Sequence, residues 1–414
     1  MKNLRFSLSS ILLPILVIPI IMTYRINAGE TNYLQFGAIF LCFFANLLID
    51  VLNLNNNLYV KLKYFFFFAV LVLAVGGAFV SSIVVRHQVA PVFQIHDIIL
   101  QLEAAIRFFL DGINPWQATY HNTHMAAWHF SDTLENPALY HFVMMPMYLL
   151  FSLPFYWLSN HTIGYFDGRI PLFLLFFSLI PLIFALVKDR EQRFLFTLIL
   201  LLNPAMFLYT LEGRSDYFMF AFLFASLCLL YWRRYGWAGV AMALAFTVKQ
   251  SVWPILPLYI IFIYINSNGL IQTTKRLLSF VLVFTGITLP FFLWNPQAFL
   301  NSTVLYLSGN TVHSYPISGY GLGMLLHQFG IIKDLSASYP FIVWQIIIIG
   351  PLLVSLYLLL RKNTSVRMFI FTYGILLFAY WYLSRYFNNS HVAYLSMVFI
   401  TAYFWPDDKA IKHK

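Results

Sequence analysis

Runs of apolar residues alternate with short polar breaks along almost the whole chain. A helix of about 20 apolar residues can cross a lipid bilayer, and many of these runs approach that length. The runs predicted to be transmembrane helices are residues 8–24, 33–50, 64–85, 169–187, 194–210, 217–232, 237–250, 252–265, 277–294, 341–360, 368–384 and 391–405. The pattern therefore predicts an all-α polytopic membrane protein with about 12 transmembrane helices and both ends of the chain in the cytoplasm.

The composition agrees with this class. Of the 414 residues, 61% are hydrophobic and 10% are charged, whereas soluble domains carry about 25% charged residues. The net charge of +10 does not indicate a nucleic-acid partner, because the basic residues gather at the ends of the predicted spans, where they orient a membrane protein. The two cysteines, Cys42 and Cys228, lie far apart in apolar runs and indicate neither a disulfide framework nor a metal site.

One more apolar segment, residues 138–158, is left out of the predicted spans. If it crossed the membrane, every later basic loop would move to the outer side, against the positive-inside rule. Pro146 and Pro154 in its interior, with His141 near its start, also fit poorly with an ordinary membrane helix. The segment is therefore predicted to form interfacial or re-entrant helices.

Two long segments then lie on the outer side, residues 86–168 and 295–340. The first contains seven of the eleven histidines, and the short cytoplasmic loops carry little polar chemistry beyond their charges. His121, His124 and His129 could share one side of a helix, but their spacing matches no strong metal motif. We therefore expect no metal and no cofactor, and we expect the functional residues on the outer face.

The stretch 96–120, HDIILQLEAAIRFFLDGINPWQATY, follows the third predicted span directly, so it begins just outside the membrane surface. From Ile98 onward the apolar residues recur with helical spacing on one face, which predicts a short helix lying in the membrane interface. Asp111 and Gly112 would end this helix. The result is a carboxylate, Asp97, at the level of the lipid headgroups.

Two interpretations of this stretch stay open. Asp97 could be catalytic, or it could be only the N-cap of the helix, since Asp is a preferred capping residue. Glu103 and Arg107, four residues apart, could pair on the helix surface.

Further charged residues are expected at the same depth. Asp216 follows the break EGRS in the stretch NPAMFLYTLEGRSDY, and Lys249 ends the apolar run GWAGVAMALAFTVK. Arg385 and His391 lie at the outer ends of the last two spans, in YLSRYFNNSHVAY. Each has a structural alternative: Asp216 as a helix cap, Lys249 as a lysine extended to the interface, and Arg385 as a rim residue at a lipid phosphate. Charged residues inside a membrane nonetheless often mark a functional site.

In their order and membrane side, these motifs resemble the GT-C superfamily of membrane glycosyltransferases, and most closely the polyprenol-phosphate-mannose-dependent mannosyltransferases. The likeness rests on the Asp after an early span, the helix ending FFLDGINPW, and the runs NPAMFLYTLEGRSDY and AGVAMALAFTVKQSVWPILP. It covers residues 64–266, with weaker similarity at SRYFNNSHVAY. The chain departs from the family because residues 1–63 add two spans and because His96 replaces an acidic neighbour that some members carry. Residues 267–414 would complete a single integral membrane domain.

The resemblance implies transfer of a hexose such as mannose from a polyprenyl-phosphate donor to a lipid or glycan acceptor. Asp97 would be the base in an inverting displacement without a metal. The implied substrate-binding residues are His96, Glu103, Asp216, Lys249, Arg385 and His391, with Lys249 or Arg385 at the donor phosphate. The site would face outward from a bacterial plasma membrane.

Two other classes of function stay open. A transporter or lipid-linked glycan flippase would also have many spans and buried charges, although transporters usually show matching broken helices in two halves. A polysaccharide polymerase or ligase would place its key residues in a large late loop, and residues 295–340 are long enough for one.

Overall fold

The computed structural model describes residues 7–23, 32–52, 54–129 and 135–407, and this part of the chain is almost entirely helical. Its two strands, β1 (Ser318–Gly319) and β2 (Tyr386–Phe387), form one short parallel pair. The predicted all-α class is therefore confirmed. The basic residues at the two ends of the chain, before residue 7 and after residue 407, lie outside the described residues.

The helices follow the predicted apolar runs closely. The first part of the chain forms α1 (Leu8–Thr23), α2 (Tyr33–Val51), α3 (Asn56–Val70), α4 (Gly77–Val89), α5 (Asp97–Leu110) and α6 (Pro146–Thr162). The middle part forms α7 (Arg169–Leu186), α8 (Arg190–Leu201), α9 (Phe207–Leu211), α10 (Asp216–Tyr231), α11 (Tyr235–Phe246), α12 (Leu256–Ile265) and α13 (Leu270–Trp294). The last part forms α14 (Pro296–Leu300), α15 (Tyr306–Ser308), α16 (Leu322–Gln328), α17 (Phe341–Lys362), α18 (Val366–Tyr382) and α19 (Asn389–Phe404).

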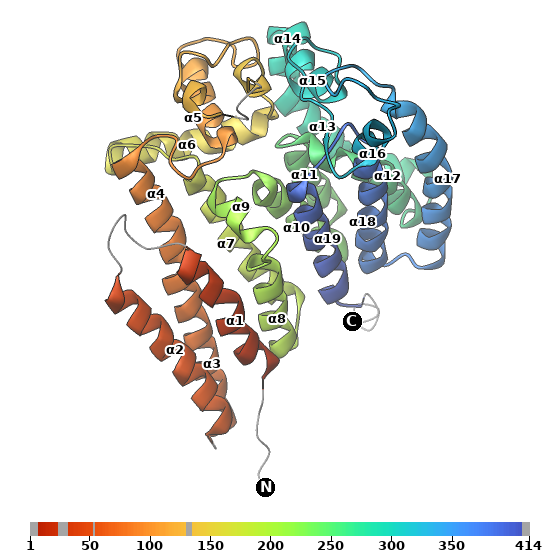
Figure 1. Ribbon diagram of the computed structural model, residues 1–414. Helices are drawn as coiled ribbons and strands as arrows, with labels where there is room; N and C mark the ends of the chain where they lie inside the picture. Colours follow the sequence, from red (N-terminus) through yellow and green to blue (C-terminus); the bar gives the residue numbers. More distant parts are fainter. Residues whose placement is uncertain (1–6, 24–31, 53, 130–134, 408–414) are drawn as a thin grey trace.

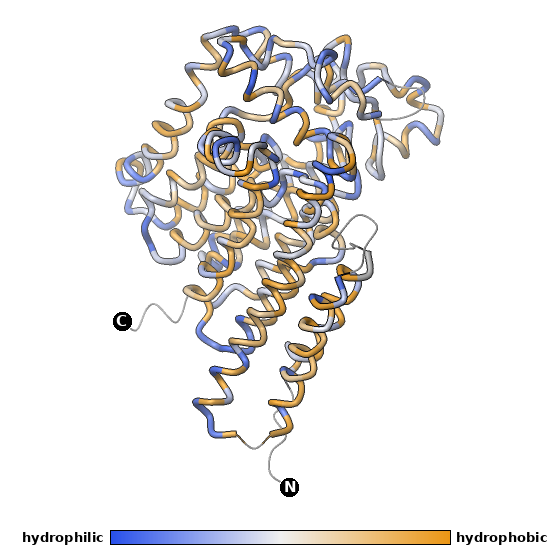
Figure 2. Tube along the Cα trace, turned by 90° about the vertical axis from the view of Figure 1, so that its left-hand side faces the viewer, coloured by the Kyte–Doolittle hydropathy of each residue, from blue (hydrophilic) through white to orange (hydrophobic). Residues whose placement is uncertain are grey.

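Among the described residues, five helices are long and apolar enough to cross a membrane. They are Tyr33–Val51, the continuous helix Asn56–Val89, Arg169–Leu186, Leu270–Trp294 and Phe341–Lys362. The other predicted spans form shorter helices, and the run 194–210 is divided at Asn203, between α8 and α9. Figure 2 shows hydrophobic residues along most helices and hydrophilic residues in the loops at their ends. The total of 12 crossings stays a prediction.

The two segments predicted to lie outside the membrane gather at one end of the molecule, the upper end in Figure 1. The Ser302 hydroxyl donates to the Trp116 carbonyl at 2.9 Å, and the Trp116 and Phe299 rings lie 5.2 Å apart. The Tyr140 and His313 rings stack with centroids 3.4 Å apart. The two segments therefore form one joint layer.

Residues 138–158 form a single helix only from Pro146 onward. Pro146 occupies the first turn of α6, where its missing N–H costs nothing. The N–H groups of Met145 and Met147 donate to the carbonyls of Val248 and Thr247, at 3.1 and 2.8 Å. The start of α6 is thus joined to the end of α11, and α6 is not among the five helices named above.

Helix α5 is enclosed by protein along most of its length. The residues from Ile99 to Ile106 are all buried, including Gln101, whose side-chain amide donates to the carbonyls of Ala138 and His141 at 2.7 and 2.6 Å. The predicted apolar face exists, but the opposite face is covered too. The position of α5 in the membrane interface stays a prediction, and protein covers this part of the helix on both faces. Gly112, with φ of +74°, does end the helix as predicted.

Two glycines allow the first turn of α5 to pack closely against its neighbours. Gly213 has a φ of +96°, and a Cβ there would lie 2.3 Å from Cγ1 of Ile99. A Cβ on Gly168 would lie 3.1 Å from Cγ2 of Ile99. The turn before α10 can reach α5 only because residue 213 has no side chain.

Replacing this glycine should therefore be costly. We expect Gly213→Ala to lower the stability of the folded protein by at least about 2 kcal/mol, because it combines overpacking with an unfavourable φ. Gly112→Ala is the matched control, since Gly112 also has a positive φ but a Cβ there meets nothing within 4 Å. Thermal unfolding of both variants in detergent measures the difference. Equal unfolding temperatures would contradict the close contact.

Candidate active site

Two adjoining chambers, lined in part by the same residues, lie at the first residues of α5. The larger chamber has a volume of about 500 Å³ and the smaller one about 130 Å³. Six residues line both chambers: His96, Asp97, Arg214, Tyr315, Tyr386 and Asn388. Asp97 is thus at the junction of two spaces, one of which also contains Asp216, Lys249 and His391.

The Asp97 carboxylate is only 4% exposed and is held by two neighbours. The Asn136 amide donates to Oδ2 at 3.0 Å, and Nδ1 of His96 lies 2.6 Å from Oδ1. Burial raises the pKa of Asp97, but the charge and hydrogen bond of His96, together with the Asn136 amide, outweigh it and keep this pKa below its ordinary value. Asp97 is therefore a carboxylate at neutral pH, as a proton acceptor must be.

The N-cap position of α5 is occupied by His96 and not by Asp97. The His96 backbone is extended, and α5 begins at Asp97. The His96 N–H donates to the Glu212 carbonyl at 2.7 Å, which ties the start of α5 to the turn before α10. Asp97 lines the cavity from the first turn of its helix, where a negative charge is favourable.

The structure brings Lys249 and Asp216 together in the smaller chamber. Nζ of Lys249 lies 2.8 Å from Oδ1 of Asp216, and both side chains are largely buried. His391 lines the same chamber, and its Nδ1 lies 2.7 Å from Oδ1 of Asn388, which caps α19. The expectation that these residues share one depth therefore extends to a shared cavity.

Arg214 is a cavity residue that the sequence interpretation missed. Its guanidinium lies over the Tyr209 ring, 4.1 Å from the centroid, and its nearest carboxylate oxygen, on Glu212, is 3.9 Å from Nε. The buried Nε has no hydrogen-bond partner among the described residues. The motif EGRSD contained the signal, but the arginine had been interpreted only as part of a break between helices.

Tyrosines and asparagines from distant segments complete the cavity. The Tyr315 hydroxyl donates to Oδ1 of Asn136 at 3.3 Å, and the rings of Tyr315 and Tyr386 lie 5.9 Å apart. Asn136 belongs to the first outer segment and Tyr315 to the second. Neither type of residue stands out in an apolar sequence, so only the contact between the two segments identifies them.

Arg385 has a different environment from the one expected for a phosphate ligand. Its three guanidinium nitrogens donate to four backbone carbonyls, those of Tyr315, Leu335, Ser336 and Ala337, at 2.6 to 3.2 Å. It lines a separate cavity of about 700 Å³ beside α17 and α18. Arg385 therefore holds residues 315–337 in place, and this segment carries Tyr315 into the Asp97 cavity.

Glu103 also lies apart from the Asp97 chambers and lines a different cavity, of about 290 Å³. The Arg86 guanidinium binds its carboxylate with two contacts of 2.7 and 2.8 Å, and both side chains are buried. The predicted surface pair of Glu103 with Arg107 is therefore wrong. The long Arg86 side chain reaches Glu103 from α4, whereas Arg107 is exposed at the end of α5.

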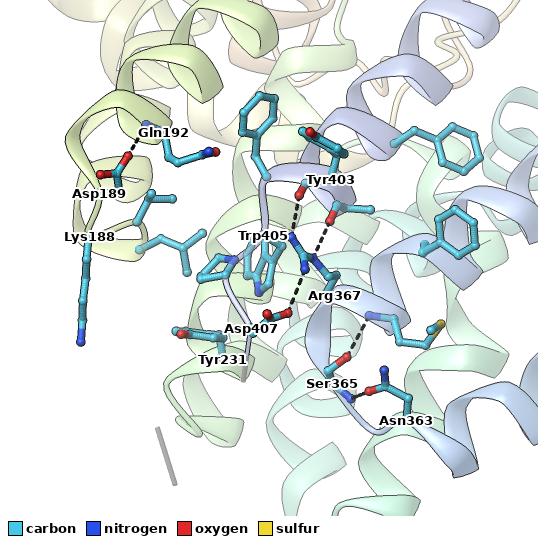
Figure 3. A pocket seen from close by; sticks show the side chains of 18 residues that line it. Lys188, Asp189, Gln192, Tyr231, Asn363, Ser365, Arg367, Tyr403, Trp405 and Asp407 are labelled. Carbon is cyan, nitrogen blue, oxygen red and sulfur yellow. Dashed lines mark hydrogen bonds and ion pairs between the residues drawn. The ribbon is translucent and has the colours of Figure 1, made fainter. Parts of the chain in front are cut away.

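The largest cavity described, about 990 Å³, lies at the opposite end of α7 from the Asp97 region. Its chief cation, Arg367, donates to the carbonyls of Ala402 and Tyr403 and to the Asp407 carboxylate, as Figure 3 shows. Lys188 extends away from these groups in the same view. Arg367 and Asp407 are thus already paired with each other, and Arg367 also with the backbone.

Within the described residues there is no group of three or more His, Cys, Asp and Glu side chains that could hold a metal ion. Comparison with known proteins adds no family assignment, because no family model, curated protein or solved structure matches the chain.

Arg385 and Arg214 should respond differently to substitution. Arg385→Ala leaves four carbonyls without their charged donor, and hydrogen bonds to charged groups contribute about 1.5–3 kcal/mol each. We therefore expect it to lower the unfolding temperature in detergent by well over the 2–4 °C that about 1 kcal/mol produces. Arg214→Ala should change it little, because Arg214 has few protein partners. The reverse order of the two unfolding temperatures would refute these assignments.

Proposed function

We propose that the chain is a membrane glycosyltransferase of the GT-C type. It transfers a hexose such as mannose from a polyprenyl-phosphate donor to a hydroxyl of a lipid or glycan acceptor on the outer side of the membrane. The observation that carries the proposal is a buried carboxylate, Asp97, kept ionised at the junction of two chambers that also contain Arg214 and Lys249.

The proposed reaction is a single displacement. The acceptor oxygen attacks the anomeric carbon of the donor while the bond from that carbon to the phosphate oxygen breaks. Asp97 takes the proton of the acceptor hydroxyl, and the polyprenyl phosphate leaves with the bonding electron pair. A positioned base contributes about 10²–10⁴ in rate.

Arg214 is the best candidate for the leaving phosphate. It has an unused buried Nε, and an arginine binds phosphate oxygens through parallel donors. Lys249 adds positive charge in the smaller chamber, although Asp216 partly neutralises it. Cations at a departing phosphate stabilise the charge that develops there. Arg385 is not assigned to the leaving phosphate, because its guanidinium nitrogens already donate to backbone carbonyls.

The membrane arrangement belongs to the same proposal. Twelve spans with cytoplasmic ends would place the cavity outside, in a bacterial plasma membrane, where a nucleotide-sugar donor would be absent and a lipid-linked sugar available. The rival classes, a lipid-linked glycan flippase and a polysaccharide polymerase, differ in what they need from Asp97. A flippase moves lipid without transferring a hexose, so the transfer assay distinguishes it from the proposed enzyme.

The role of Asp97 is tested by Asp97→Asn. The amide keeps the size of the side chain and can still meet His96 and Asn136, so we expect normal folding. It removes the proton acceptor, so transfer from a polyprenyl-phosphate hexose should fall by at least about 10². Asp111→Asn, an exposed aspartate at the far end of the same helix, should keep full activity. A folded Asp97→Asn protein with near-normal transfer would exclude this base.

The orientation is tested with single cysteines in a background that lacks Cys42 and Cys228. Ala126→Cys, in the exposed part of the first outer segment, should react with a membrane-impermeant thiol reagent on intact cells. Arg234→Cys, exposed between α10 and α11, should react only after the cells are opened. Labelling of Arg234→Cys on intact cells would overturn the proposed topology, whether or not the separate Ala126→Cys protein is labelled.

A further inference from the structure

The larger chamber has a lining unlike that of a lipid site. Its aliphatic residues are Val92 and Ile95, and the rest are aromatic, polar or charged. Its volume of about 500 Å³ is within the range of small-molecule sites. Beyond the residues it shares with the smaller chamber, it is distinguished by Trp128, Gln94 and Glu212.

Trp128 is fixed so that its ring, and not its N–H, is available to a ligand. The indole Nε1 donates to the Ile95 carbonyl at 2.9 Å. The ring centroid lies 5.9 Å from that of His96, the neighbour of Asp97. The side chain is only partly buried and lines the chamber. An indole face carries partial negative charge and attracts the weakly positive C–H groups of a ligand.

Gln94 gives an independent sign of function in the same chamber. It is one of two non-glycine residues with positive φ among the described residues, at +47°. Such a backbone is uncommon outside glycine, and strained backbone often occurs at ligand sites. The strained turn presents residues 92–95 to the chamber directly before His96 and Asp97.

The polar groups around the indole include both donors and acceptors. Glu212 has a partly exposed carboxylate, 38% accessible, that can accept from hydroxyls. The Gln94 amide can do both, and Arg214 can donate. An aromatic face bordered by donors and acceptors suits a ring that has C–H groups on its faces and hydroxyls on its edges.

We infer that the acceptor is a carbohydrate, and that a pyranose ring packs on Trp128 while one of its hydroxyls reaches Asp97. This inference rests on the proposed function and narrows its acceptor from a lipid or glycan to a saccharide. A lipid chain would require an apolar lining, and an extended peptide would require backbone partners along an edge. Trp128 is a substrate-binding residue, separate from the chemical step.

The test uses saccharide binding and transfer as separate measurements. Binding of methyl hexopyranosides and short oligosaccharides to the full-length wild-type protein and its variants is followed by saturation-transfer NMR, without donor. Transfer is measured with a polyprenyl-phosphate hexose and either a saccharide or a threonine-containing peptide as acceptor. The variants are Trp128→Ala and Trp128→Phe, with Trp157→Ala as the control, because Trp157 is 63% exposed on α6.

We expect Trp128→Ala to weaken saccharide binding, and to raise the acceptor KM, by about tenfold. The donor KM should not change, Trp128→Phe should keep part of the affinity, and Trp157→Ala should behave as wild type. The inference is overturned if Trp128→Ala binds saccharides as wild type does, or if the peptide is the better acceptor. Trp128-dependent saccharide binding without any transfer would instead refute the glycosyltransferase proposal and leave the saccharide site standing.

Discussion

A buried network of two arginines and two carboxylates fixes the position of α5, and the rest of the site depends on that helix. Arg86 of α4 binds Glu103 of α5 and also contacts Asp167 at 2.9 Å. Arg169, the first residue of α7, binds Asp167 through two nitrogens at 2.8 and 2.9 Å. Breaking a buried ion pair by removing one partner typically costs about 3–5 kcal/mol, so the three helices are held in one arrangement.

The charges in this network are matched so that burial is tolerable. Burial alone would raise the pKa of Asp167, but Arg169 and Arg86 keep it well below its ordinary value. The network also accounts for Glu103, whose carboxylate accepts from the N–H of Gly168 at 3.2 Å as well as from Arg86. A residue that looked like a surface or substrate-binding carboxylate is thus part of the internal support for Asp97, six positions earlier on the same helix.

The cavity is assembled from segments that are far apart in sequence. His96 and Asp97 come from the start of α5, Arg214 from the turn before α10, and Lys249 from the end of α11. Tyr315 comes from the second outer segment, which the Arg385 guanidinium holds by its carbonyls. The charged groups that face the cavity are therefore held in place by arginines and carboxylates that do not line it. Stability and activity should thus be separable by mutation.

The sequence by itself determined the helical class, the apolar runs, the end of α5 at Gly112, and the group of Asp97, Asp216, Lys249 and His391. These follow from local patterns, since hydropathy and turn residues act within a few positions along the chain. Only the tertiary structure decided that Glu103 pairs with Arg86, that Arg385 binds carbonyls and that Arg214 faces the cavity. The physical reason is that a long charged side chain can reach several partners, and the nearest one is set by how helices pack. The sequence spacing of Glu103 and Arg107 therefore predicted the wrong ion pair for Glu103.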